Sequence, residues 1–142
     1  MMTIHNEIVE APMSQRIRYF EYRPYRPIVM DYFRKDPSMI ITSVPKPLMR
    51  DDSYNPEYWL LSTAQRRIAA KTKKFCLKEE EIFFDAADCL LLGKMMFVQI
   101  SPCTNLTGFA WLKRHFEPKG IEVAILIFVP NSNICCIQHN SV

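Results

Sequence analysis

Apolar and polar positions alternate along this 142-residue chain in a way that predicts strands interspersed with short helices. Proline, glycine and capping residues mark where most of these elements begin or end. The first half has the less regular pattern. It predicts, in order, a strand at 4–10, a helix at 14–22, a short helix at 28–33, a strand at 39–42, a long loop at 45–58 and a helix at 62–73 that opens with the capping box of Ser62 and Gln65.

The second half has the clearer pattern. It predicts a strand at 81–84, two apolar segments at 89–92 and 95–100 joined at Gly93–Lys94, a helix capped by Thr104 or Asn105 that ends at Phe116, and a strand at 121–129. The last strand is apolar at nearly every position, which is typical of a strand covered on both faces. The order strand, strand, helix, strand makes one unit at 81–129, and a fainter copy occupies the first half. Such repetition indicates a radial architecture built from copies.

Composition narrows the class of protein without identifying it. A net charge of +3 from 18 basic and 15 acidic residues is too balanced to predict a nucleic-acid or membrane partner. Basic and aromatic residues alternate at 16–34, but acidic residues intervene, so a solvated or internally paired surface is the better interpretation. The five cysteines have no zinc-like spacing and are interpreted as reduced thiols. Only three glycines in the chain favour a part of a larger protein.

Two carboxylates at the junction of two apolar runs are the best candidates for chemistry. Asp85 and Asp88 are three residues apart in the stretch Phe84-Asp85-Ala86-Ala87-Asp88. A carboxylate is rarely buried unless another group pairs with it. The pattern alone leaves two interpretations open: a turn in which aspartate bonds the local backbone, or a carboxylate that points into a cleft at the end of a sheet.

Several stretches together resemble the glycine amidinotransferases and their amidinotransferase relatives. The resemblance covers roughly residues 6–131, and it depends on the order and spacing of the motifs rather than on any single one. The matching residues are Asn6–Met13, Arg18, Phe20–Arg23, Tyr25–Arg26, Asp31–Phe33, Pro45–Pro47, Tyr54–Asn55, Phe84–Asp88, Thr104–Asn105, Gly108, Trp111 and Arg114–His115.

The resemblance implies an α/β fold of the pentein type, a five-bladed α/β propeller of ββαβ units, of which the chain at 1–142 would hold only a partial set of blades. It implies a transferase that moves the amidino group of L-arginine to glycine, giving ornithine and guanidinoacetate, the precursor of creatine. It implies small-molecule substrates, no nucleic acid, and neither metal nor organic cofactor. It also allows a homodimer, a mitochondrial location and peripheral association with a mitochondrial membrane.

The resemblance implies that a cysteine carries the amidino group covalently while a histidine moves protons. It assigns the catalytic carboxylate to Asp85 and a supporting position in the turn to Asp88. The family's substrate-binding aspartate, catalytic histidine and nucleophilic cysteine match no residue of this sequence. Cys135, Cys136 and His139 lie in another context, so none of them takes those roles.

Residues 132–142 diverge from the family, and a shifted reading frame or a mispredicted exon is one hypothesis for that tail. The N-terminal residues show neither an apolar signal core nor a transit pattern. We therefore expect a partial amidinotransferase that is inactive by itself. Two alternatives stay open: a non-catalytic remnant or binding module, and a related enzyme with a different amine acceptor.

Overall fold

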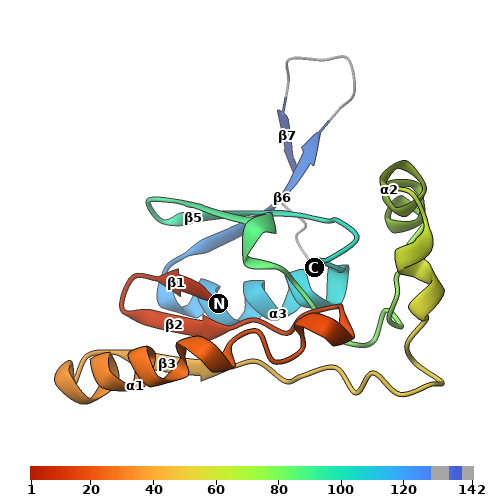
Figure 1. Ribbon diagram of the computed structural model, residues 1–142. Coiled ribbons are helices and arrows are strands. Elements are labelled where there is room, and N and C mark those ends of the chain that lie inside the picture. Colours follow the sequence, from red (N-terminus) through yellow and green to blue (C-terminus); the bar gives the residue numbers. More distant parts are fainter. Residues whose placement is uncertain (129–134, 139–142) are drawn as a thin grey trace.

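The computed structural model describes residues 1–128 and 135–138, which form two small mixed sheets and three helices (Figure 1). The strand orders are β1-β2-β3 and β4-β5-β6-β7. The strands are β1 (Met2–Ile4), β2 (Glu7–Glu10), β3 (Ile40–Ser43), β4 (Cys89–Leu92), β5 (Met95–Gln99), β6 (Glu122–Phe128) and β7 (Cys135–Gln138). The helices are α1 (Arg26–Lys35), α2 (Thr63–Lys71) and α3 (Leu106–Phe116), and short 3-10 helices are η1 (Arg16–Arg18), η2 (Arg23–Tyr25), η3 (Pro56–Leu60), η4 (Ala86–Asp88) and η5 (Glu117–Lys119).

The two sheets share one pattern of connections. β1 pairs antiparallel with β2, and β2 pairs parallel with β3 after a crossover that contains α1. In the same way β4 pairs antiparallel with β5, and β5 pairs parallel with β6 after a crossover through α3. A parallel pair needs such a long connection, usually a helix. The strand–strand–helix–strand order is therefore present twice, and the less regular copy expected in the first half is confirmed as a sequence of elements.

One prediction for the first strand is wrong. The sequence predicts a continuous strand at 4–10, whereas the chain turns back at His5 and Asn6 and forms the β1–β2 hairpin. His5 takes the left-handed conformation with φ of 52°. Met2 and Ile4 of β1 are buried, so the hairpin adds the apolar side chains of a further strand to the core.

The predicted helix at 14–22 is also wrong. The segment forms only the single turns η1 and, beyond it, η2, and Gln15 provides no side-chain cap at the start of η1. Ile17 is 91% exposed and Phe20 is 52% exposed, so the apolar positions do not form a buried face. Without such a face an isolated helix of this length has little to stabilise it.

The predicted strand at 81–84 is wrong, although its side chains are buried as a strand would require. Phe83 and Phe84 are fully buried. Their backbone groups bond outside any sheet, because the N–H of Phe84 donates to the carbonyl of Pro12 and the carbonyl of Phe83 accepts from the N–H of Asn105. The unit that is predicted to open at 81 therefore opens its first strand at Cys89.

Other predicted elements are confirmed where a local signal specifies them. The hydroxyl of Ser62 accepts from the backbone N–H of Gln65, whose side chain accepts from the N–H of Ser62, so the capping box is present. Asn105, rather than Thr104, caps α3 by accepting from the N–H of Gly108. Pro27 lies in the first turn of α1. No helix within 1–128 or 135–138 is long and apolar enough to cross a membrane.

One hydrophobic cluster joins the two sheets. It brings Val9 of β2 together with Val98 of β5, Leu112 of α3 and Val123 of β6. Consecutive side chains of β6 at 123–125 are buried, which confirms a strand covered on both faces. A second, smaller cluster connects the long loop and α2 to the segment before Asp85. The sheets therefore form one body, with α1 and α2 at opposite ends of it (Figure 1).

Most of the tail that is predicted to diverge lies outside the described residues, including His139. Of 132–142 the structure describes only β7, which pairs antiparallel with β6.

Candidate active site

Asp85 lies at the junction between the two copies of the repeated unit. It follows the buried pair Phe83 and Phe84 and immediately precedes the single turn η4 and the strand β4. Its Oδ1 accepts from the N–H of Ala87 at 3.2 Å, so Asp85 caps that turn. Its side chain is 15% exposed. The turn interpretation and the cleft interpretation therefore do not exclude each other, because Asp85 caps a turn and still reaches the surface.

The backbone around Asp85 is fixed by the N-terminal end of α3. The N–H of Asp85 donates to the hydroxyl of Thr104 at 3.0 Å. The buried amide of Asn105 accepts from Gly108 and donates to the carbonyl of Glu81 at 2.8 Å. A Cβ on Gly108 would lie 2.2 Å from the carbonyl oxygen of Phe83, so only glycine permits this close approach. The helix start therefore sets the position of the carboxylate.

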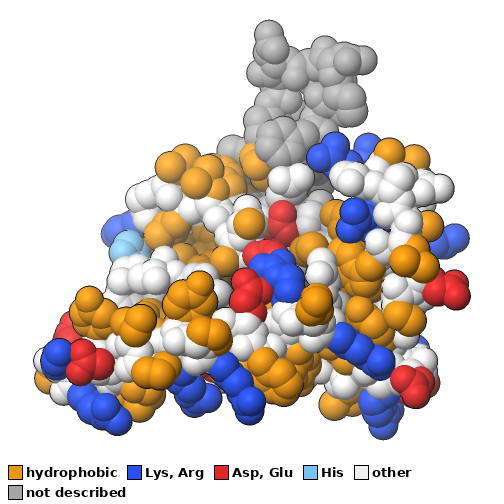
Figure 2. Space-filling model, in the orientation of Figure 1, with side chains coloured by type: hydrophobic (Ala, Val, Ile, Leu, Met, Phe, Trp, Pro, Cys, Tyr) orange, Lys and Arg blue, Asp and Glu red, His pale blue; other side chains and the backbone are white. Residues whose placement is uncertain are grey.

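The carboxylate of Asp85 is paired with a guanidinium from the first unit. Arg18 Nη1 donates to Asp85 Oδ2 at 2.6 Å, and the two residues are 67 positions apart in the chain. The Nε and Nη2 groups of Arg18 donate to the two oxygens of Glu21 at 2.6 and 3.1 Å. Sequence reasoning predicts internal pairing in this basic segment, which is confirmed for Arg18, but it does not identify Asp85 as the partner. On the face shown in Figure 2, acidic and basic side chains meet near the middle, between hydrophobic ones.

Asp88 has a different environment from Asp85. Its Oδ2 accepts from the hydroxyls of Ser101 and Thr104, both at 2.6 Å. Burial raises the pKa of Asp88, the two hydroxyl donors oppose that rise, and the charge of Asp85 adds to it. Asp88 thereby connects the turn at 86–88 to the loop before α3. This geometry suits a supporting residue, and the role itself stays a prediction. Sequence reasoning did not identify Ser101 or the hydroxyl role of Thr104.

Two cysteines lie close to Asp85, but neither has the character of a nucleophile. Cys89 Sγ donates to the carbonyl of Asp85 at 3.7 Å, and burial raises the pKa of this thiol to about 12. Burial also raises the pKa of Cys103. Since the thiolate is the reactive form, the raised pKa makes both thiols poorer nucleophiles. Cys76, Cys89 and Cys103 are free, as the interpretation of reduced thiols requires, while the side chains of Cys135 and Cys136 lie outside the described part.

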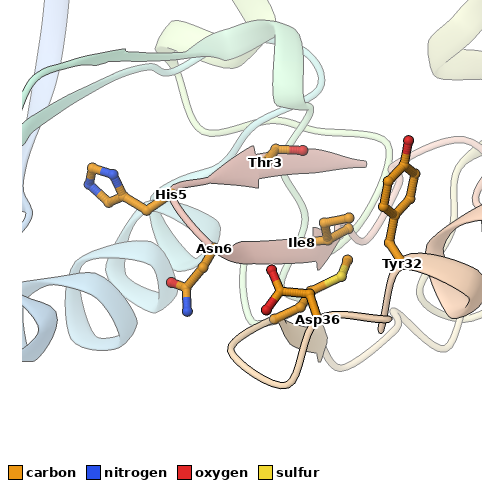
Figure 3. A pocket seen from close by; sticks show the side chains of 7 residues that line it. Thr3, His5, Asn6, Ile8, Tyr32 and Asp36 are labelled. Carbon is orange, nitrogen blue, oxygen red and sulfur yellow. The ribbon is translucent and has the colours of Figure 1, made fainter. Parts of the chain in front are cut away.

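The metal-binding potential of the described residues and two hollows among them bear on what the carboxylates could bind. Within 1–128 and 135–138 no group of three or more His, Cys, Asp or Glu side chains could hold a metal ion. A hollow of about 230 Å³ lies between the β1–β2 hairpin and the end of α1 (Figure 3). Its lining residues are Thr3, His5, Asn6, Ile8, Tyr32, Asp36 and Met39. In Figure 3 His5 lies at the opposite end of the hollow from Tyr32.

A second hollow of about 420 Å³ lies between the loop at 51–55 and the segment at 73–79. Asp85 lines neither hollow. The Asp85–Arg18 pair, at the protein surface, is therefore the arrangement with the clearest chemical use. A fixed carboxylate of this kind can bind a planar cation in bidentate fashion.

Comparison with known proteins gives this site a context. No family model matches the sequence. The chain is 42% identical over 128 residues to the mitochondrial glycine amidinotransferase of Xenopus tropicalis, a match that covers 90% of this chain and 30% of that protein. It is 34% identical over 115 residues to the L-arginine:L-lysine amidinotransferase of Pseudomonas savastanoi, covering 81% of this chain and 30% of that protein.

A solved structure gives the same relationship. The chain matches SxtG, an amidinotransferase of the saxitoxin biosynthetic pathway in Microseira wollei, with a TM-score of 0.69 and 36% identity. That match covers 88% of this chain and 32% of SxtG. The chain thus spans about 30% of the length of the curated relatives it matches.

Proposed function

The chain belongs to the amidinotransferase family, and from that membership we propose that Asp85 is the catalytic carboxylate of an enzyme that transfers the amidino group of L-arginine to glycine. The observation that carries the proposal is the placement of Asp85, in the family's Phe-Asp-Ala-Ala-Asp motif, as a fixed carboxylate that reaches the surface. The identity of 42% to a glycine amidinotransferase supports glycine as the acceptor.

The proposed reaction has two transfers. A cysteine thiolate attacks the guanidinium carbon of L-arginine, and the bond from that carbon to Nε breaks. Ornithine then leaves with a proton from a histidine. The amine of glycine then attacks the amidino carbon, the carbon–sulfur bond breaks, and guanidinoacetate is released as the histidine takes up the proton. Asp85 would hold the guanidinium in plane and favour the charged form of the histidine.

This chain would supply the carboxylate of that reaction and not its nucleophile. Cys89 and Cys103 next to Asp85 are buried thiols of raised pKa, and no residue matches the family's cysteine or histidine motifs. We propose that the chain is inactive by itself. The two strand–strand–helix–strand units would then be blades of a five-bladed propeller, and they support that arrangement by repeating one connection pattern.

Incubation of the chain with L-arginine and glycine is expected to yield no guanidinoacetate, measured by mass spectrometry. The decisive experiment is a chimera in which residues 6–128 replace the aligned segment of the Xenopus tropicalis enzyme. We expect an active chimera, and Asp85→Asn should lower its kcat by at least about a hundredfold. Asp31→Asn is the matched control, because Asp31 is exposed and its carboxylate pairs with the nearby Lys35. Equal activity of the two variants would refute the role of Asp85.

A non-catalytic remnant is the second candidate, and the raised pKa of the thiols around Asp85 favours it. A chimera that folds but makes no product, with Asp85 intact, would support this alternative. The acceptor is tested in the same chimera by competition between glycine and L-lysine, because the relative from Pseudomonas savastanoi is named for L-lysine.

The remaining parts of the proposal concern partners and location. We propose a homodimer and a mitochondrial location, with peripheral association with a mitochondrial membrane. The names of the relatives support the location. Sedimentation of the chimera and fractionation of cells that express the complete protein would test these points.

A further inference from the structure

We propose that Arg18 is the positioning residue of Asp85, and that Glu21 in turn fixes Arg18, so that three side chains form a preset acceptor for one planar cation. The inference rests on the proposed role of Asp85. It concerns a segment whose sequence pattern points to an amphipathic helix, and which the structure uses in another way.

The first step is the geometry of the guanidinium. Arg18 presents two different edges: Nε and Nη2 contact Glu21, and Nη1 contacts Asp85. A guanidinium is planar and rigid, so contacts on two edges fix both its position and its plane. The neighbouring Arg16 provides a contrast, because its ion pair with Asp51 is 3.3 Å long and the Asp51 side chain is fully exposed.

The second step is the local backbone. The chain at 16–25 forms only isolated turns and leaves Ile17 and Phe20 exposed, while Tyr19 packs against the second cluster. Arg18 is two-thirds buried and reaches a carboxylate of the other unit. The Arg18–Asp85 pair, 2.6 Å long, therefore adds a polar contact between the units to the packing of Tyr19.

The third step is charge. Hydrogen bonds that Arg18 donates to Glu21, opposed by burial and assisted by Asp85, raise the pKa of Arg18, so its guanidinium stays charged. Two carboxylates and one guanidinium leave the trio with one net negative charge. A single monocationic group, such as the guanidinium of arginine, brings that sum to zero.

The fourth step is capacity. An ionised carboxylate offers about four lone-pair sites. Asp85 uses one on Ala87 and one on Arg18, and its side chain is 15% exposed. By this count Arg18 fixes the carboxylate and leaves it able to accept two further N–H groups from a ligand.

The test uses the full 142-residue chain labelled with ¹⁵N, and the reporter is the amide of Ala87, which donates to Asp85. Arg18→Ala should shift the Ala87 resonance and speed its hydrogen exchange, while core amides such as Val98 stay in place. Arg16→Ala is the matched control from the same turn and should leave Ala87 unchanged. Methylguanidinium chloride should restore the Ala87 resonance of Arg18→Ala saturably, at roughly tenfold lower concentration than methylammonium chloride.

An unchanged Ala87 resonance in Arg18→Ala would overturn the proposal. Equal rescue by the two cations would also overturn it, because it would show that Arg18 acts through its charge and not through the planar shape of its guanidinium. If Arg18→Ala does not fold, Glu21→Gln keeps the charge of Arg18 and removes one of the two carboxylate oxygens to which Arg18 donates. That variant should shift the Ala87 resonance in the same direction, and an unchanged resonance would also overturn the proposal. The Ala87 resonance is measured on the 142-residue chain and does not depend on catalysis. If the chimera is inactive while methylguanidinium still restores this resonance, the proposed function fails and the positioning of Asp85 by Arg18 stands.

Discussion

The strongest test of the fold concerns Glu7, a carboxylate of β2 whose side chain is only 4% exposed. Its Oε1 contacts His115 Nε2 at 2.7 Å, its Oε2 accepts from Lys119 Nζ at 2.6 Å, and the hydroxyl of Thr42 also donates to it. His115 lies on α3 and Lys119 just beyond it, so this cluster joins the first unit to the second. Replacing Glu7 by Gln removes the charge while it keeps the shape.

The expected loss follows from these three partners. A hydrogen bond to a charged group contributes about 1.5–3 kcal/mol to stability, and leaving one partner of a buried pair alone costs about 3–5 kcal/mol. Lys119 is 39% exposed and can turn back into water, which reduces its share. We therefore expect Glu7→Gln to lower the free energy of unfolding by about 2–3 kcal/mol, or the Tm by about 5–10 °C.

The pH dependence of the stability difference provides a second, independent test of the contribution of Glu7. Burial alone would raise the pKa of Glu7, but the hydrogen bonds from Lys119, Thr42 and His115 and the charge of His115 outweigh it, so the pKa lies below the ordinary value of 4.5. A carboxyl group whose pKa is lowered by folding stabilises the chain above its unfolded pKa, and that contribution is lost as the pH falls through the folded pKa. Below pH 4.5 the difference between the unsubstituted chain and Glu7→Gln should shrink.

The assay is urea unfolding followed by circular dichroism at pH 7 and at several lower values. Glu80→Gln is the matched control, because Glu80 is exposed. A Glu7→Gln variant within about 0.5 kcal/mol of Glu80→Gln at pH 7 would refute the reasoning, since that is the range of ordinary surface substitutions. A pH-independent difference would show that the pair contributes through packing rather than through charge.

Three further substitutions test the support of the site and the exposed edge. Gly108→Ala should prevent the native fold or cost more than about 3 kcal/mol, because its Cβ would lie 2.2 Å from the carbonyl of Phe83; loss of the cooperative transition in circular dichroism would show this. Asn105→Ala should cost about 2–4 kcal/mol by the same measurement, since it removes a helix cap and leaves buried carbonyls without a donor. Strand β4 lies at a sheet edge, and Leu90 and Leu92 on it are 54% and 58% exposed, so we expect this edge to promote association. Leu90→Lys with Leu92→Lys should reduce concentration-dependent light scattering, and unchanged scattering would contradict that expectation.

Elements with a local signal could be predicted from the sequence. The capping box at Ser62, the capping Asn105, the turn at Gly93 and the apolar run that became β6 each depend on residues within a few positions of one another. The structure that these local residues favour agrees with the tertiary fold, so the prediction from sequence holds.

The errors occurred where a distant partner decides the structure. The run at 81–84 has the composition of a strand, but Pro12 and Asn105 take its backbone hydrogen bonds. The apolar spacing at 14–22 resembles that of a helix, but Ile17 is 91% exposed, so the apolar positions have no buried face. The pairing of Asp85 with Arg18 spans 67 positions, and no local pattern specifies which cation a carboxylate meets across such a distance. The sequence thus singled out Asp85 and Asp88, but it did not identify the side chains that contact them.

The junction between the two units is where stability and the candidate site meet. The ion pairs of Glu7 with His115 and Lys119, and of Arg18 with Asp85, all run from the first unit to the second. Trp111 of α3 stacks on Phe84, the residue before Asp85, with ring centroids 5.8 Å apart, and also on His115, the partner of Glu7, at 4.6 Å. Since packed aromatic rings have few alternative arrangements, a shift of α3 at the Glu7 cluster has to move Phe84 as well. The Asp85 carboxylate therefore has contacts with both units, because Thr104 and Ala87 of the second unit and Arg18 of the first all bond to this residue.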